Sequence, residues 1–511
     1  MTTTTENNKK IAKNTLFLYF RQILIMVVSL YTVRVVLAAL GEEDYGIYNV
    51  VGGFVAMFNI LSGALSVAIS RFITYEMGQR DFNTLKLQRI FSTSIIIQVM
   101  MGVIIALLIA TFGVWFVTHK MVIPAGRMDI TLYVLLCSTI TFFINLLSVP
   151  YNALIIAHEQ MKAFAYISIL EVAMKLLVAY LLLVVSMDKL LLYACCMVLV
   201  SLTIRSVYAI YCKRHFAECH FIWGFDRQLL SKMFVFSGWA FMGSGAVVMK
   251  DQGTGILLNL FGGSVVNAAQ GIAMQVNAAV YSFVSNFMLA SNPQITMNFS
   301  SGKLEAMHSL ILRTAKFGFF ILLLMLFPLC SNIDYLLGLW LVQVPEHTTH
   351  FVILVLLYSL IECFVGPLVT GVLAHGNIKR YEIILTGLYF TNIVASYLCL
   401  KVGMPVESVF VMNIIFKALV LIALLQHAKV KFAFPVYRFL KETLLPAMLV
   451  FVVSGSFAYW ISQNEMQYFL QFIVRSLLIV LFTSISIYAL GLKHEERLYF
   501  KNLIKNKIGY K

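Results

Sequence analysis

Lys250 and Asp251 are adjacent near the middle of the apolar stretch 236–260, which is long enough to cross a membrane as a helix. A charge at that depth costs about 2.5–3.5 kcal/mol on insertion scales, so charged residues inside spans usually face a protein interior or a water-filled cavity. Five glycines in the same stretch would let the helix bend or let another backbone approach closely. We interpret this helix as one wall of a transport cavity. The alternative is a neutralised ion pair that only fixes helix register.

Seven further basic residues lie within or at the edges of apolar stretches: Arg21, Arg34, Arg71, Lys175, Arg205, Lys417 and Arg475. An anion that crosses a low-dielectric barrier needs fixed positive charge along its route. The candidates for binding an anionic substrate are Arg21, Arg34, Arg71 and Lys250. Because side chains turn by about 100° per residue, Arg21 and Arg34 point about 140° apart on a straight helix, and Arg21 is favoured. Arg71 lies near a predicted membrane boundary and is equally consistent with an interfacial anchor.

Amide and hydroxyl side chains recur at helical spacing in the next apolar stretch, 265–297, at Asn267, Gln270, Asn277 and Tyr281. Such groups suit sugar hydroxyls and ring faces, so this stripe is a candidate substrate-binding surface. The alternative is hydrogen bonding between helices, worth about 0.6 kcal/mol for each bond.

Three acidic residues at membrane depth, Asp251, Glu171 and Glu362, are candidates for binding a coupling ion, either a proton or sodium. Asp251 is favoured because glycines surround it, although a salt bridge to a neighbour explains it equally well. Glu171 lies four residues before Lys175, and this spacing favours a structural ion pair.

The elements that must position these residues are membrane spans. The chain has 511 residues, of which 60% are hydrophobic and only 12% charged, and its mean hydropathy is +0.88. These values indicate an all-α polytopic membrane protein without a large soluble domain. We predict about fourteen transmembrane helices, the first at 14–40 and the second at 47–75. The eight cysteines are scattered, without CxxC or HExxH motifs, so we expect no metal or other cofactor.

The net charge of +15 is explained by topology. With the N-terminus in the cytoplasm, most of the Lys and Arg residues fall in cytoplasmic segments and very few fall in outer turns. This distribution places both termini in the cytoplasm, requires an even number of spans, and argues against nucleic acid as a partner.

An internal repeat predicts the architecture. The segments PYNALIIAHEQMKAF from Pro150 and PLVTGVLAHGNIKRY from Pro367 align without a gap, which pairs His158 with His375. Gly78, Asp81 and Arg89 have the same spacing as Gly302, Glu305 and Arg313. We therefore predict an N-terminal lobe at 1–215 and a C-terminal lobe at 216–430, each of six helices, related by a pseudo-twofold axis along the membrane normal. A C-terminal helix pair and cytoplasmic tail follow at 431–511.

The segments LGEEDYGIYNVVGGF and SGALSVAISRFITYEMGQRDF, followed later by AHEQMKAFAYISILEVAMKL, complete the motif set. Their order and spacing resemble those of the polysaccharide-transport branch of the multidrug/oligosaccharidyl-lipid/polysaccharide exporter superfamily, which includes O-antigen unit flippases. The resemblance implies a V-shaped, two-lobed transporter that moves lipid-linked oligosaccharides to the outer leaflet by alternating access.

On this basis we expect a non-enzymatic flippase in the bacterial cytoplasmic membrane. Its substrate would be an undecaprenyl-pyrophosphate-type oligosaccharide for surface polysaccharide or lipopolysaccharide, and its neighbours would be membrane lipid and a polysaccharide polymerase or ligase. One alternative is a cation-coupled drug or metabolite antiporter of the same superfamily, although basic residues outnumber acidic ones at membrane depth. Another is a membrane-bound polymerase or ligase, which would need a larger outer loop than this chain provides.

Overall fold

The computed structural model describes residues 2–79, 83–119, 121, 123, 126–185, 187–222, 226–341, 344–463 and 469–498. Over these residues the chain is helical, without a strand. Thirteen helices are long and apolar enough to cross a membrane, and the number rises to 14 if the bent pair Glu43–Ala56 and Asn59–Met77 counts as one span. The expected all-helical, multi-pass architecture with about fourteen spans is therefore confirmed.

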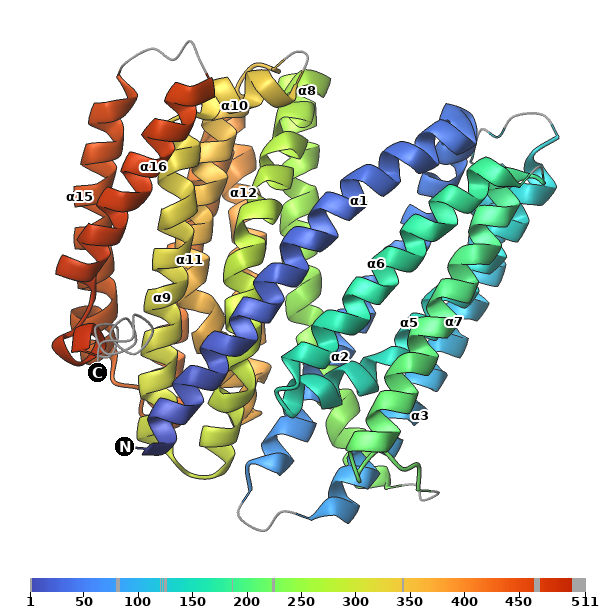
Figure 1. Cartoon of the computed structure of the whole chain (residues 1–511), viewed down its shortest axis with the longest axis horizontal. Helices are drawn as coiled ribbons and strands as arrows, with labels where there is room; N and C mark the ends of the chain where they lie inside the picture. The colour runs from blue at the N-terminus through green and yellow to red at the C-terminus, as the bar shows by residue number, and fades with distance from the viewer. Residues whose placement is uncertain are drawn as a thin grey trace. The chain divides into compact units, whose positions relative to one another are not determined.

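The chain forms two compact units, and helix α8 (Arg227–Ser300) contributes to both. Unit 1 consists of the residues up to Gly245 together with Thr296–Lys303. Its other helices are α1 (Thr2–Ala56), α2 (Asn59–Met77), α3 (Thr84–Leu108), α4 (Val114–His119), α5 (Met128–Ala157), α6 (Met161–Val184) and α7 (Lys189–His215) (Figure 1). Two apolar clusters fill this unit, one around Ile73 and Leu154 and the other around Val51 and Leu182.

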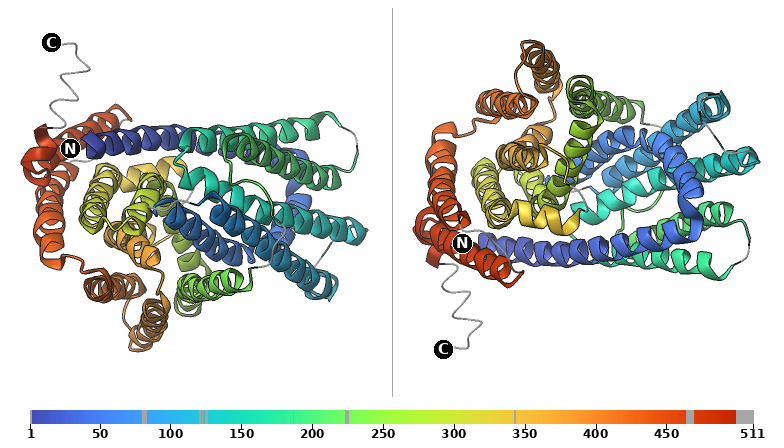
Figure 2. Two further views of the ribbon diagram at one scale, coloured as in Figure 1. Left: turned by 90° about the horizontal axis from the view of Figure 1, so that it is seen from below. Right: turned by 90° about the horizontal axis from the view of Figure 1, so that it is seen from above.

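Unit 2 consists of Ala246–Ile295 and the residues from Leu304 onward. Its further helices are α9 (Leu304–Cys330), α10 (Ile333–Trp340), α11 (Thr348–His375), α12 (Lys379–Lys401), α13 (Ser408–Phe432), α14 (Val436–Phe439), α15 (Leu445–Ser462) and α16 (Phe469–Ser486). The Phe319 ring of α9 stacks on Phe364 of α11, with ring centres 5.0 Å apart, in the centre of this unit. Helices α15 and α16 pack against each other and against α9 at one edge of the unit (Figure 2).

Two glycines break long helices in the same way. Gly41 in α1 has φ 80° and ψ 171°, and Gly263 in α8 has φ 74° and ψ −170°. Residues with a Cβ atom avoid this backbone region, so glycine is required at both breaks. A further bend of 44° follows α1 at residues 57–58. The second span, predicted as continuous over 47–75, is therefore divided between α1 and α2.

The aligned repeat segments share local geometry. Pro150 lies inside α5 and Pro367 inside α11, and the aligned residues that follow these helices, Glu159 and Gly376, both have positive φ, at 56° and 88°. Gly78 ends α2 where a Cβ atom would lie 1.9 Å from the Ser300 hydroxyl oxygen. Asp81, which the repeat pairs with Glu305, lies outside the described residues.

The N-terminal ends of α5 and α11 carry a repeated contact between a basic side chain and a carboxylate. Arg127, just before α5, binds Asp188, just before α7, and also donates to Asp44 at 2.8 Å. His347, just before α11, contacts Glu407, just before α13, at 2.5 Å. In each unit one such pair therefore joins the starts of two helices that pack together.

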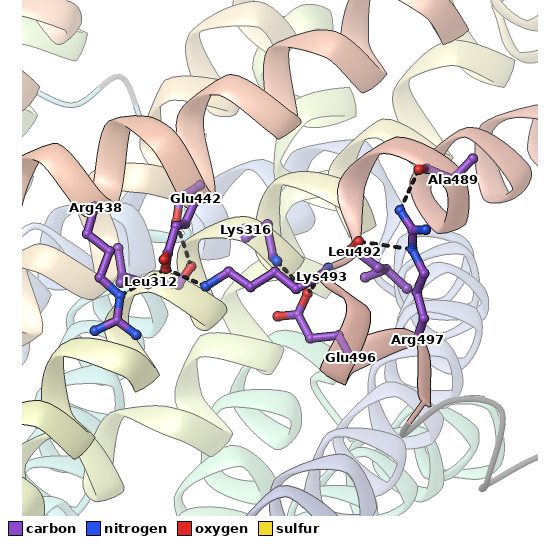
Figure 3. A network of polar contacts seen from close by, with 10 residues as sticks. Leu312, Lys316, Arg438, Glu442, Ala489, Leu492, Lys493, Glu496 and Arg497 are labelled. Atoms are coloured by element: carbon purple, nitrogen blue, oxygen red, sulfur yellow. Dashed lines mark hydrogen bonds and ion pairs between the residues drawn. The ribbon is translucent and has the colours of Figure 1, made fainter.

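Polar contacts hold the segment after α16 against α9 (Figure 3). Lys316 of α9 is 2% exposed and pairs at 2.6 Å with Glu496, which also accepts a hydrogen bond from the Lys493 backbone N–H. The Lys493 ammonium pairs with Glu442, and Glu442 also binds Arg438 at 2.9 Å. The C-terminal part of unit 2 is thus attached by buried and half-buried charges as well as by apolar packing.

Candidate functional site

A cavity of about 260 Å³ lies inside unit 2, among α8, α11, α12 and α13. Gly263 divides α8 into two arms, and both arms contribute side chains to the cavity. Six of the residues selected from the sequence line it together: Lys250, Asp251, Gln270, Asn277, Tyr281 and Glu362. Lys417, one of the basic residues noted in the sequence, also lines the cavity, together with five polar residues that sequence analysis did not select: Thr254, Tyr358, Ser359, Tyr389 and Asn413.

Two buried lysines dominate the cavity. Lys250 on α8 and Lys417 on α13 are 5% and 4% exposed. Their ammonium nitrogens lie 4.6 and 5.3 Å from the centre of the Tyr358 ring, and each lies 5.9 Å from the centre of the Tyr389 ring. The two positive charges therefore converge on the same pair of phenol rings, which stabilise them through cation–π attraction.

Each lysine also has its own carboxylate. Lys250 pairs with Asp251 at 2.7 Å, and Lys417 pairs with Glu362 and donates to the Tyr389 hydroxyl at 3.3 Å. The carboxylates are less buried than the lysines, since the side chains of Asp251 and Glu362 are 38% and 27% exposed. Paired charges of this kind reduce the cost of burying either charge alone.

Neutral polar groups form another part of the lining. The Ser359 hydroxyl donates to Asn277 at 2.6 Å, and the Tyr281 hydroxyl donates to the Met288 sulfur at 3.9 Å. Within the described structure the buried Asn413 Oδ1 has no hydrogen-bond partner. The cavity therefore presents hydrogen-bonding groups beside the two positive charges.

A glycine in α8 allows the amide groups to approach the lysine arm. A Cβ atom at Gly255 would lie 3.3 Å from Gln270 Oε1, so a larger residue there would require the Gln270 side chain to shift slightly. Asn267 lies one turn before Gln270 and is exposed, and it does not line the cavity.

The other residues selected from the sequence belong to unit 1. Arg21 of α1 is half-buried, with its guanidinium 4.8 Å from the centre of the Phe164 ring, whereas Arg34 is exposed. Arg71 of α2 lies against the rings of Phe72, Tyr75 and Phe236 at 4.8, 4.7 and 5.5 Å. These aromatic contacts are consistent with either a binding or an anchoring role.

Glu171 pairs with Lys175 at 2.6 Å within α6, which confirms the local ion pair predicted from their spacing. A second, smaller cavity of about 150 Å³ in unit 1 carries only uncharged side chains, including Asn59, Ser138 and Asn145. Sequence analysis did not select these residues.

Helices that span a membrane repeatedly, with paired charges around a polar cavity inside them, define a membrane transporter. The family described as "Polysaccharide biosynthesis protein" matches residues 11–303, more than half of the chain. The chain belongs to this family, in the polysaccharide-transport branch of the multidrug/oligosaccharidyl-lipid/polysaccharide exporter superfamily. A search of curated protein sequences gives no match.

Solved structures of MATE transporters share the fold. A variant MATE protein has a TM-score of 0.70 at 14% identity, covering 83% of this chain and 96% of its own. An outward-facing multidrug resistance MATE family transporter of the MOP superfamily has a TM-score of 0.68 at 14% identity, with the same coverage of both chains. A variant of the Vibrio cholerae MATE transporter VcmN has a TM-score of 0.68 at 15% identity, covering 84% of this chain and 99% of its own. At these identities the likeness establishes the fold alone.

Proposed function

We propose that this protein is a flippase that moves a lipid-linked oligosaccharide across the bacterial cytoplasmic membrane by alternating access. The substrate would be of the undecaprenyl-pyrophosphate type and would supply surface polysaccharide or lipopolysaccharide, including O-antigen. Membership of the polysaccharide biosynthesis family supports this substrate class.

The observation that carries the proposal is the cavity of unit 2. Two lysines provide positive charge for an anionic group, while Gln270, Asn277 and Tyr281 provide donors and acceptors for hydroxyl groups. The volume of about 260 Å³ is smaller than that of a typical drug-sized pocket, so the cavity would hold only one part of an oligosaccharide.

The remaining parts of the proposal concern the membrane. The distribution of basic residues favours cytoplasmic termini, and the sequence repeat favours two like-oriented six-helix halves followed by a C-terminal pair. Arg21, Arg34 and Arg71 remain candidates for contacts to the substrate phosphates. A coupling ion, and a polymerase or ligase that receives the glycan, are further expected partners.

A drug or metabolite antiporter is the second candidate, because the solved structures with this fold include a multidrug resistance transporter and because two carboxylates line the cavity. A cationic substrate would have to approach both lysines, and this repulsion disfavours it.

The test is complementation of a strain that lacks the flippase, with surface glycan measured at equal amounts of membrane-inserted protein. We expect Lys250→Ala or Arg21→Ala to reduce surface glycan at least about tenfold, since each removes a charge proposed to contact the substrate. Lys175→Ala is the matched control, because it removes a half-exposed membrane lysine that already has a local partner. Normal glycan in both test variants, or export of a cationic dye by vesicles, would refute the proposal.

A further inference from the structure

We propose that the cavity of unit 2 binds the carboxylate of an acidic sugar in the transported glycan, and that Glu362 takes up a proton when this carboxylate replaces it at Lys417. This inference rests on the proposed function and adds to it a substrate class and a linked proton.

The first step of the argument is the convergence of the lysines. Both ammonium groups lie within 5.3 Å of the centre of the Tyr358 ring, although α8 and α13 are far apart in the sequence. Two like charges placed around one ring repel each other, and two separate structural ion pairs would not need to share that ring. A single anion bound between the lysines would contact both of them.

The second step concerns charge balance. The cavity lining holds two lysines and two carboxylates, so the lining has no net charge while all four groups are ionised. A bound anion would leave one uncompensated negative charge in a poorly solvated place. Protonation of one carboxylate would restore neutrality. A monoanionic carboxylate balanced by one proton satisfies this condition, whereas a dianionic phosphate ester does not.

The third step identifies the carboxylate that exchanges. Asp251 lies on the same helix as Lys250, one residue further on, so no movement of one helix against another can separate their backbones. Glu362 reaches Lys417 from a different helix, α11, and its side chain is only partly enclosed, at 27% exposed. Glu362 is therefore the group that can leave its lysine.

The fourth step concerns the sugar. The buried Asn413 Oδ1, 7% exposed as a residue, is an acceptor without a partner in the described structure. Such an acceptor is costly unless a ligand or water donates to it. A sugar hydroxyl is a suitable donor, and the adjacent Tyr358 and Tyr389 rings offer surfaces for the apolar face of a sugar ring.

The experiment measures glucuronate binding to the purified full-length protein by calorimetry in buffers of different ionisation enthalpy. We expect uptake of about one proton for each glucuronate bound, and an affinity that weakens about tenfold for each pH unit above neutrality. Glucose should bind without proton uptake, and inorganic sulfate should bind more weakly than glucuronate because it lacks the sugar. Tighter proton-linked binding of glucose 1-phosphate than of glucuronate would overturn the assigned carboxylate, and equal binding of sulfate would overturn the assigned sugar.

Two variants separate a binding site from a structural ion pair. Glu362→Gln imitates the protonated glutamate, so this variant should bind glucuronate without proton uptake, and its affinity at high pH should equal that of the unaltered protein at low pH. The double variant with Glu362→Gln and Lys417→Met should not bind glucuronate. Glu382→Gln, at a buried glutamate of unit 2 outside the cavity lining, should retain the normal proton uptake. If Glu362→Gln is less stable than the unaltered protein and glucuronate does not restore its melting temperature, the pair is structural and the inference fails.

The two proposals fail in different ways. If the unaltered protein supports surface glycan and Lys250→Ala does not, but glucuronate binds without a proton or not at all, only the present inference is refuted. If glycan export does not depend on the protein, the proposed function is refuted, whatever the cavity binds.

Discussion

A buried charge must be compensated by a fixed partner, and Lys316 illustrates this at the scale of one residue. Its ammonium group is almost fully enclosed in unit 2 and contacts Glu496 of the segment that follows α16. Removing one member of a buried pair typically costs about 3–5 kcal/mol, whereas replacing both members with apolar residues is often nearly neutral.

We therefore expect Glu496→Gln to lower the melting temperature of the purified protein clearly, by the equivalent of about 3 kcal/mol or more. The double variant with Lys316→Met and Glu496→Leu should recover most of that loss. Glu305→Gln is the control, because Glu305 is 81% exposed and its contact with Arg438 is a surface contact. Equal melting temperatures for Glu496→Gln and the unaltered protein would show that the pair contributes little.

At this scale, the sequence predicted which charged residues are functional candidates, but not which neutral side chains line the cavity beside them. Lys250, Asp251 and Glu362 could be selected because a charge at membrane depth is rare and costly. Tyr358 and Asn413 could not, because tyrosine and asparagine occur on many helices of this chain and only packing decides which side chains face a cavity. The amide stripe was predicted in part, since Gln270 and Asn277 line the cavity and Asn267 does not.

At the scale of helices, the predicted spans correspond to observed helices because about 20 apolar residues suffice to cross a membrane and leave a clear signal. The bend between α1 and α2 left no such signal, since Met57 and Phe58 are as apolar as the residues around them. The repeated contacts before α5 and α7 and before α11 and α13 were likewise unpredicted, because each joins residues about sixty positions apart.

The contact between His347 and Glu407 predicts a pH dependence. Burial raises the pKa of the Glu407 carboxyl. A backbone hydrogen bond and the contact with His347 lower the pKa by more than burial raises it, so the pKa lies below its ordinary value of 4.5. A carboxyl group with a lowered pKa stabilises the fold fully above its ordinary pKa, and this contribution is lost as the pH falls through the lower folded-state pKa.

We expect Glu407→Gln to lower the melting temperature at about pH 6 and to have progressively less effect as the pH approaches about 3, because the unaltered carboxyl is then protonated too. Glu346→Gln, at an exposed neighbouring position, should change little at either pH. If Glu407→Gln lowered the melting temperature as much near pH 3 as near pH 6, the ionised Glu407 carboxylate would not be the stabilising group.

At the scale of the whole molecule, the sequence repeat predicts two halves, and its aligned segments share local geometry in the two units. In the structure, the boundary between the two compact units lies inside α8, after Gly245. The boundary between the predicted halves lies at residue 215. Sequence similarity follows the order of the spans, but packing follows contacts in space, and a helix of 74 residues takes part in both units.

Membrane orientation is the whole-molecule property that labelling can test. In a variant without the eight native cysteines, we expect Met404→Cys in the turn after α12 to react with a membrane-impermeant maleimide in intact cells. Lys303→Cys, in the turn between α8 and α9, should react only after permeabilisation, because the excess of basic residues favours the cytoplasm for that turn. Both positions are exposed, so access across the membrane is the only difference expected. The reverse pattern would invert the proposed orientation.

Helix α8 passes from unit 1 to unit 2 after Gly245 and returns after Ile295, without a loop at either passage. Two of the passages between the units are therefore continuous helix, and a third lies in the turn between Lys303 and Leu304. Both helical passages have a weak point. Gly245 has no neighbouring atom within 4 Å of where a Cβ would lie, and Pro293 lacks the N–H that would close its turn of helix. Stiffening these two positions with alanine would be expected to slow a conformational cycle while leaving both units intact.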